Sequence, residues 1–190
     1  TARRRMWPMS RRAEYTDKAM ASEAVVSVIR ERLGDAVEVV ELRDRKAGLS
    51  DAVCFHDLWL RCPKDKLLEV LDILFELDFP FFHVMSGNDE GEAVLLNYHF
   101  SLFQGSGRAS RLGVAVSVYL PKDDLTMPSI QDRIPGAEYS EREMREMLGI
   151  NFMGMPDESL VFLPEDWDER IKPWRRDEAG PKPEQIRELS

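Results

Sequence analysis

The residues with the most direct chemical potential are three histidines and two cysteines. His56, His83 and His99 each fall within an expected strand, and none has a partner at metal-ligand spacing. Cys54 and His56 would share one face of a strand, since residues i and i+2 point the same way. Two ligands are too few for a closed metal site, so we predict no metal-binding and no cofactor-binding residues.

Motifs for nucleophilic catalysis and phosphate binding are equally hard to find. The sequence lacks the nucleophile elbow that a Ser-His-Asp arrangement needs. The turn Gly105-Ser-Gly107 has neither the strand–loop–helix context nor the lysine of a phosphate-binding loop, so it is interpreted as a hairpin loop. Glu141, Glu143 and Glu146 resemble acid/base carboxylates, but charged helix faces are usually solvated. The alternative is that Glu141 and Arg142 are buried against a partner. No catalytic residue is predicted.

These carboxylates belong to the stretch Pro135–Trp167, around which the chain is organised. Ser140 stands where a helix N-cap is expected, and Glu143 three residues later completes a capping box. Apolar residues then recur at helical spacing, and Gly149 supplies the stop signal. A short charged helix is therefore predicted here.

Beyond Gly149 the chain is predicted to form an extended tail. Glycine and proline recur too often for regular helix. The tail nevertheless carries large apolar side chains, which need a surface to receive them. These are Phe152, Leu160, Phe162, Leu163 and Trp167.

Upstream elements predict an α+β fold. Amphipathic spacing predicts helices at 17–33 and 64–77. Alternating or β-branched runs predict strands at 36–42, 53–60, 79–85, 93–103 and 112–120, with a polar loop at 43–50 and a turn at 86–91. This order indicates a mostly antiparallel sheet with two helices on one face, followed by a short helix and an extended C-terminal docking tail.

Composition divides the 190 residues into three regions. Residues 1–15 form a basic N-terminal tail, 16–120 the α+β domain, and 121–190 the short helix and docking arm. A hydrophobic content of 43% supports a folded core, and a net charge of −9 argues against a general nucleic-acid binder. No stretch approaches the length of a membrane span, and the two unpaired cysteine positions favour a reducing cytosol.

The C-terminal stretch resembles the NuoC-like, or thirty-kilodalton, subunit family of respiratory complex I and related membrane-bound nickel–iron hydrogenases and sulfur-reducing complexes. Order and spacing of the motif agree, and the upstream α+β region suits the family. The matching residues are Glu141-Arg142-Glu143, Leu148-Gly149-Ile150, Phe152, Gly154, Pro156-Asp157, Leu163-Pro-Glu-Asp-Trp167 and Pro173-Trp-Arg-Arg-Asp177.

Several positions depart from the family pattern. Arg145-Glu146 stands where an aromatic-Asp pair is usual, Leu148 replaces Phe, and Met155 replaces the His before Pro-Asp. Trp174 and Glu178 replace Leu and the closing Tyr. These departures favour the hydrogenase and sulfur-reducing members over a quinone-reducing complex I.

The resemblance implies a cofactor-free, non-catalytic structural or assembly subunit of a peripheral arm. Its partners would be a large catalytic subunit and an iron–sulfur small subunit, which would hold the iron–sulfur clusters and, in a hydrogenase, nickel–iron. The chain would lie on the cytoplasmic side, peripheral to the membrane through other subunits, without nucleic acid. The expected interface residues are Glu141, Arg142, Glu143, Gly149, Phe152, Pro156, Asp157, Leu163, Trp167, Trp174, Arg175, Arg176 and Asp177.

Three alternatives stay open. The first is a quinone-type complex I subunit. The second is a free-standing α+β regulatory module, which would need a polar-lined cleft within 15–120, where no convergent polar group is evident. The third is a nucleic-acid adaptor acting through Arg3–Arg12, which conflicts with the acidic whole. Electron donor, acceptor and pumped ion belong to other subunits.

Overall fold

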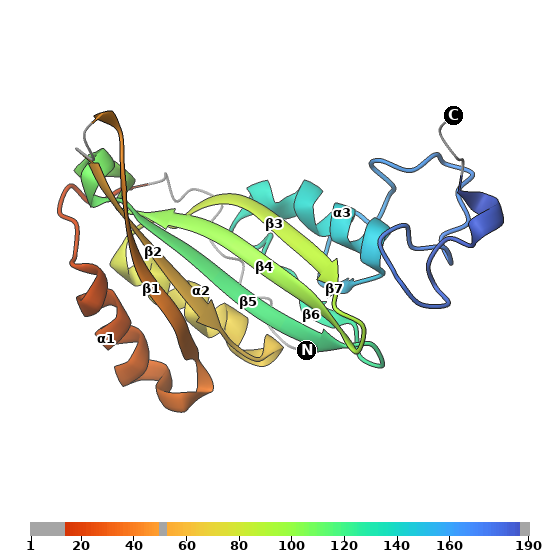
Figure 1. Cartoon of the computed structure of the whole chain (residues 1–190), viewed down its shortest axis with the longest axis horizontal. Helices are drawn as coiled ribbons and strands as arrows, with labels where there is room; N and C mark the ends of the chain where they lie inside the picture. The colour runs from red at the N-terminus through yellow and green to blue at the C-terminus, as the bar shows by residue number, and fades with distance from the viewer. Residues whose placement is uncertain (1–13, 50–52, 187–190) are drawn as a thin grey trace, which may run out of the picture.

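A five-stranded sheet forms the body of the protein (Figure 1). The computed structural model describes residues 14–49 and 53–186, so most of the predicted basic tail lies outside the described residues. The sheet order is β1-β2-β5-β4-β3, antiparallel except for the parallel pair β2–β5. The strands are β1 (Glu38–Ala47), β2 (Val53–Arg61), β3 (Phe81–Asp89), β4 (Ala93–Leu102) and β5 (Leu112–Pro121).

Strict alternation on β4 shows how the sequence selects the buried face. Its even-numbered residues are all buried and its odd-numbered residues are half-buried, as the two-residue period of a strand requires. In the register, Leu96 lies opposite Val118, and Phe100 lies opposite Val114. One face of the sheet therefore supplies the core. Its fully or almost fully buried members include Leu58, Leu60, Val94, Leu96, Tyr98, Phe100, Val114, Val116 and Val118.

Two helices cover this face, as predicted (Figure 1). Helix α1 (Ser22–Leu33) buries Val25 and Ile29, and helix α2 (Leu67–Leu77) buries an almost continuous apolar stripe. Both contribute to the same core as the sheet. The predicted mostly antiparallel α+β arrangement is thus confirmed.

A third helix, α3 (Glu138–Leu148), extends this layer along β3. Its Met144 and Leu148 side chains reach the core over Gly87 and Leu96. Two short parallel strands, β6 (Thr126–Pro128) and β7 (Asn151–Met153), flank it in sequence and pair with one another. The 121–190 region therefore shares a core with the sheet.

The structure corrects three local predictions. Residues 43–47 continue β1 instead of forming a loop, because the ladder to β2 pairs their backbone despite polar side chains. Residues 86–89 continue β3 instead of turning, since they pair with β4. Helix α3 begins at Glu138 after a 3-10 turn, with Ala137 as N-cap and no side-chain cap, so the Ser140 capping box is wrong. Gly149 ends α3 in the left-handed region, as predicted.

Residues 154–186, all described, form a segment that we call the arm. It lies beyond the end of the sheet, next to the C-terminal end of α3 (Figure 1). Its regular structure is limited to a 3-10 turn at Pro183–Gln185. Among the described residues, no helix is long and apolar enough to cross a membrane.

The close approach of α3 to β3 generates the first prediction. A Cβ atom at Gly87 would lie 2.5 Å from Leu148 Cδ1 and 2.6 Å from Met144 Sδ. We expect Gly87→Val to lower the free energy of unfolding by about 1–3 kcal/mol, the usual cost of overpacking. Urea unfolding measures this change. Gly136→Ala is the control, since nothing lies within 4 Å of the added carbon; equal effects of the two variants would contradict the account.

Candidate docking site: helix α3 and the arm

Glu146 on α3 holds the middle of the arm. The residue is 1% exposed, and its carboxylate accepts hydrogen bonds from three successive backbone amides, those of Val161, Phe162 and Leu163. The Phe162 and Leu163 bonds measure 3.0 and 3.3 Å. An irregular segment has no ladder to satisfy its amides, so this carboxylate takes the place of a backbone partner.

Arg142, one turn earlier on α3, holds the preceding part of the arm. Its Nε donates to the Ser159 carbonyl at 2.9 Å, and its Nη2 donates to Ser159 Oγ at 2.7 Å and to the Leu160 carbonyl. Nη1 pairs with Asp157 at 3.2 Å and with Glu138 at 3.1 Å. The planar guanidinium, with its five donors, thus fixes both carbonyls and a carboxylate of the arm.

Glu141 faces the opposite way, toward the chain between β6 and α3. Its fully buried carboxylate accepts bonds from Ile130 N at 2.7 Å, Ser129 Oγ at 2.7 Å and Gln131 Nε2 at 2.8 Å. Burial raises the pKa of Glu141, although these bonds act in the opposite direction. The glutamate therefore fixes the turn that leads into α3.

A partly buried ion network anchors the end of the arm to the sheet. Lys122, just past β5, lies 2.8 Å from Asp89 and 2.6 Å from Asp177. Arg175 pairs with Asp177 and lies 3.5 Å from Asp89, and Asp89 also accepts the Arg176 amide at 2.7 Å. The Asp89 side chain has no exposed surface. Two carboxylates and two cations thus join the β3–β4 hairpin to the arm.

The last turn of α3 supplies backbone contacts as well. Trp174 N donates to the Met147 carbonyl at 3.0 Å, and Arg175 Nη1 donates to the Leu148 carbonyl at 3.2 Å. These carbonyls are among those that a helix C-terminus leaves without partners. The arm therefore caps the helix that holds it.

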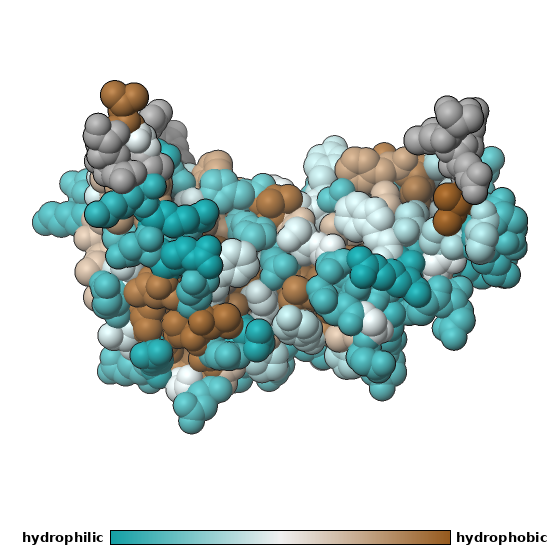
Figure 2. Space-filling model, in the orientation of Figure 1, coloured by the Kyte–Doolittle hydropathy of each residue, from teal (hydrophilic) through white to brown (hydrophobic). Residues whose placement is uncertain are grey.

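Apolar side chains nevertheless remain on the surface of α3, β7 and the arm. Phe162 is 58% exposed and Trp174 43%, although the backbone on either side of each is fixed. Figure 2 shows apolar surface over this part of the molecule. We define the exposed apolar set as Tyr139, Met153, Phe162, Trp174 and Ile186.

The predicted interface residues fall into two groups. One group has side chains largely enclosed by this chain, and the other remains accessible. Whether any of them contacts a partner stays a prediction. Enclosed or half-buried are Glu141, Arg142, Glu143, Gly149, Phe152, Leu163, Trp167, Arg175 and Asp177; exposed are Pro156, Asp157, Trp174 and Arg176.

Sequence reasoning missed several residues of this site. Asp89 and Lys122 are far from the arm in sequence and showed no motif, so only the topology reveals them. Glu146 was considered as an acid/base candidate and as part of a departure from the family pattern, but not as a residue that holds the arm. Met153 was considered as either a contact or a core methionine, whereas Tyr139 and Ile186 were not singled out from the sequence.

The histidines lie elsewhere, on the sheet. His83 and His99 line a shallow hollow of about 250 Å³ on the helix-free face, with Arg45, Trp59 and Ser101. His83 Nε2 lies 2.5 Å from Ser101 Oγ, and burial lowers the pKa of both histidines. Convergent polar groups are therefore present in the 15–120 region, which the sequence had not indicated.

Fold and arm together define an α+β domain with a C-terminal extension pinned to its last helix. The family described as respiratory-chain NADH dehydrogenase, 30 Kd subunit, matches residues 60–184, and the chain belongs to this family. The family resemblance of the motif is thereby confirmed.

Individual relatives come from hydrogenases and quinone oxidoreductases. The chain is 32% identical to the membrane-bound hydrogenase subunit beta of Pyrococcus furiosus over 168 residues, 87% of this chain and 91% of that protein. It is 38% identical over 92 residues to NAD(P)H-quinone oxidoreductase subunit J of a Synechococcus strain, covering 47% of this chain and 52% of that protein.

A solved structure shares the fold. The chain aligns with a TM-score of 0.63 and 24% identity to a chain of the membrane-bound sulfane sulfur reductase, an archaeal respiratory membrane complex. The alignment covers 80% of this chain and 81% of that one. At this identity the alignment shows a shared fold.

The Glu146 contacts predict a local effect on the arm. Glu146→Gln replaces a carboxylate by an amide with a single acceptor oxygen, so we expect the Val161–Leu163 amides to lose about 1.5–3 kcal/mol of protection. Native-state hydrogen exchange of these amides measures the loss. Glu143→Gln, a half-buried neighbour on α3, is the control. Unchanged exchange in Glu146→Gln would show that the carboxylate does not hold the arm.

The ion network predicts a pH window. Burial would raise the pKa of Asp89 and Asp177, but hydrogen bonds from Lys122, from Arg175 to Asp177 and from backbone amides outweigh it, so both are lowered. For Lys122, burial acts downward, but bonds to the two aspartates raise its pKa. The two aspartates therefore contribute fully to the free energy of unfolding above the pKa of an unfolded aspartate, roughly 4, and this contribution is lost at lower pH. The contribution of Lys122 is lost as the pH rises above roughly 10.5.

Lys122→Met tests this window. At pH 7 we expect a loss of about 1.5–3 kcal/mol in the free energy of unfolding, because charge-assisted bonds to two carboxylates disappear. The difference from wild type should shrink toward pH 2.5 and above pH 11. Lys18→Met, at an exposed lysine, should show little change at any pH. A Lys122→Met deficit that is independent of pH would contradict the ionic origin.

Proposed function

We propose that the chain is a structural and assembly subunit, free of redox cofactors, in the peripheral arm of a membrane-bound oxidoreductase of the hydrogenase or sulfur-reducing type. It would support a large catalytic subunit and an iron–sulfur small subunit during electron transfer coupled to ion translocation. It would be peripheral to the membrane, on its cytoplasmic side. The single observation that carries the proposal is an arm whose backbone is fixed by polar groups while the Phe162 and Trp174 side chains remain exposed.

Fixing the arm in advance favours docking. A flexible segment loses conformational entropy when it binds, whereas a segment already held by Glu146 and Arg142 has lost most of it during folding. The exposed side chains Phe162 and Trp174 are then available as anchors. Burying each on a partner is worth roughly 1.5–3 kcal/mol.

The choice between oxidoreductase types draws on the relatives and the motif. The P. furiosus hydrogenase subunit aligns over nearly its whole length, and the quinone-type relative over about half. Leu148 and Met155 also depart from the family pattern in the way described above. A quinone-type complex I subunit is the second candidate, because the Synechococcus protein reaches 38% identity.

Two substitutions at the arm test the docking surface. We expect Phe162→Ala with Trp174→Ala to weaken association with the large subunit by about tenfold or more, since each lost burial exceeds about 1.4 kcal/mol. The melting temperature of the chain alone should change little, because about half of each side chain is already exposed and neither belongs to the core. Trp167→Ala is less selective, since Trp167 is half-buried and its Nε1 donates to the Ile171 carbonyl at 2.9 Å.

The measurement is co-purification with a tagged chain, followed by a titration with the purified large subunit. Phe81→Ala is the matched control, an exposed aromatic side chain on the sheet, away from the arm. If wild type and the double variant bind equally, the arm is not the docking surface. A co-purifying large subunit with nickel-ligating cysteines would select the hydrogenase type, and one without them a quinone- or sulfur-linked complex. Stoichiometric flavin, iron or nickel in the isolated chain would contradict a cofactor-free subunit.

A further inference from the structure

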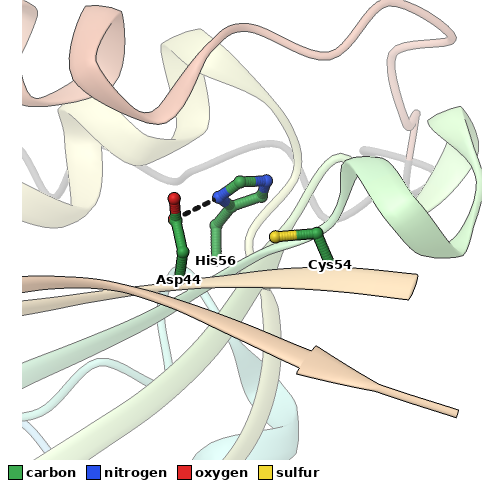
Figure 3. Close-up of side chains that lie close together, drawn as sticks. All are labelled: Asp44, Cys54 and His56. Atoms are coloured by element: carbon green, nitrogen blue, oxygen red, sulfur yellow. Dashed lines mark hydrogen bonds and ion pairs between the residues drawn. The ribbon is translucent and has the colours of Figure 1, made fainter. Parts of the chain in front are cut away.

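Three potential metal ligands meet at the end of the sheet opposite the arm. Asp44 on β1 and Cys54 and His56 on β2 point to the same side, as Figure 3 shows. Their donor atoms all lie within 4.8 Å of one another. The sequence placed Cys54 and His56 on one face, but it assigned Asp44 to a loop, so the third ligand was missed.

The register between the strands brings the three together. Asp44 on β1 lies directly opposite His56 on β2. Cys54 precedes His56 by two residues on β2, so both side chains are on the same face of the strand. Asp44 Oδ1 lies 2.6 Å from His56 Nδ1. Without the antiparallel ladder through residues 43–47, the carboxylate would have no fixed position. The unexpected extension of β1 therefore builds the cluster.

We propose that Asp44, Cys54 and His56 form a binding site for a divalent transition-metal ion of the zinc class. Thiolate, imidazole and carboxylate are the three ligand types that zinc accepts, at about 2.0–2.3 Å from each donor. A tetrahedral ion would keep its fourth position for water or for a group from outside the chain. Calcium and magnesium are disfavoured, because they prefer oxygen ligands.

The cluster is accessible and needs only small adjustments. The Asp44 side chain is 62% exposed and the His56 side chain 30% exposed, so both have room to rotate around an incoming ion. Cys54 is half-buried. The Asp44–His56 hydrogen bond explains why these two side chains lie together in the absence of a metal, but it does not explain the position of the Cys54 thiol beside them. Coordination would join all three.

A bound ion would also reinforce a weak part of the sheet. Residues 43–46 of β1 are exposed polar side chains at the sheet edge, without an apolar face to bury. Cross-strand pairs such as Arg45 with Asp57 support this part, and exposed pairs contribute little. Ligands from both strands would cross-link β1 to β2.

The site is tested on the full chain with zinc alone. Isothermal titration should give one ion per chain, and the melting temperature should rise with zinc concentration, because an ion that binds only the folded state stabilises it. Cys54→Ser, His56→Gln and Asp44→Asn should each weaken binding by at least about tenfold, since even removal of a group behind a ligand costs roughly 10–100-fold. His83→Gln, at a histidine on the helix-free face, should bind as wild type.

Thiol reactivity gives an independent readout. Cys62 is buried, and burial together with the nearby Asp65 raises its pKa to about 12. A thiol reagent should therefore modify Cys54 first in the folded chain, and zinc should slow this reaction while leaving Cys62 unaffected. Melting of the metal-free variants identifies any that fail to fold. Zinc binding that survives in Cys54→Ser and His56→Gln, or no binding below 100-fold molar excess of zinc, would overturn the proposal.

Discussion

The arm depends on one constraint. Its backbone belongs to no sheet and to no α-helix, so its amide and carbonyl groups need hydrogen-bond partners from other parts of the chain. Helix α3 supplies them from its side chains. Glu146 accepts three consecutive amides of the arm, and Arg142 donates to two of its carbonyls. Each charge-assisted bond of this kind contributes roughly 1.5–3 kcal/mol, whereas an unpaired buried group would cost as much. Side chains of α3 therefore satisfy backbone groups of the arm that regular secondary structure would otherwise satisfy, and the prolines and glycines of the arm prevent such structure.

Polar anchoring decides where the apolar side chains go. An arm held by hydrophobic contacts would bury Phe162 and Trp174 against its own domain. Here Met155 and Leu163 of the arm pack on the core, but the backbone and charged groups around Phe162 and Trp174 face α3 and the hairpin, and those two rings remain at the surface. Met144 and Leu148 on the inner side of α3 belong instead to the common core. One side of helix α3 thus packs in the hydrophobic core, and another side holds the arm through hydrogen bonds and ion pairs.

The sequence predicts those helices and strands that bury one face and expose the other. Alternation on β4 and the stripe on α2 marked their elements, because burial leaves a period in the sequence. Residues 43–47 carry no such period, and their strand exists only through pairing with β2. The family motif located the arm, but the ion network through Asp89 and Lys122 depends on contacts between distant segments. No local pattern records such contacts.

The geometry changes the meaning of the motif itself. Glu141 and Arg142 match the family pattern, and their side chains contact Ser129–Gln131 and Asp157–Leu160 of the same chain. Substituting them would alter the arm before any partner is involved. A weaker complex in an Arg142 variant would therefore not identify Arg142 as a contact. Substitution of an exposed side chain such as Phe162 tests contact with a partner directly, because it leaves the hydrogen bonds between α3 and the arm in place.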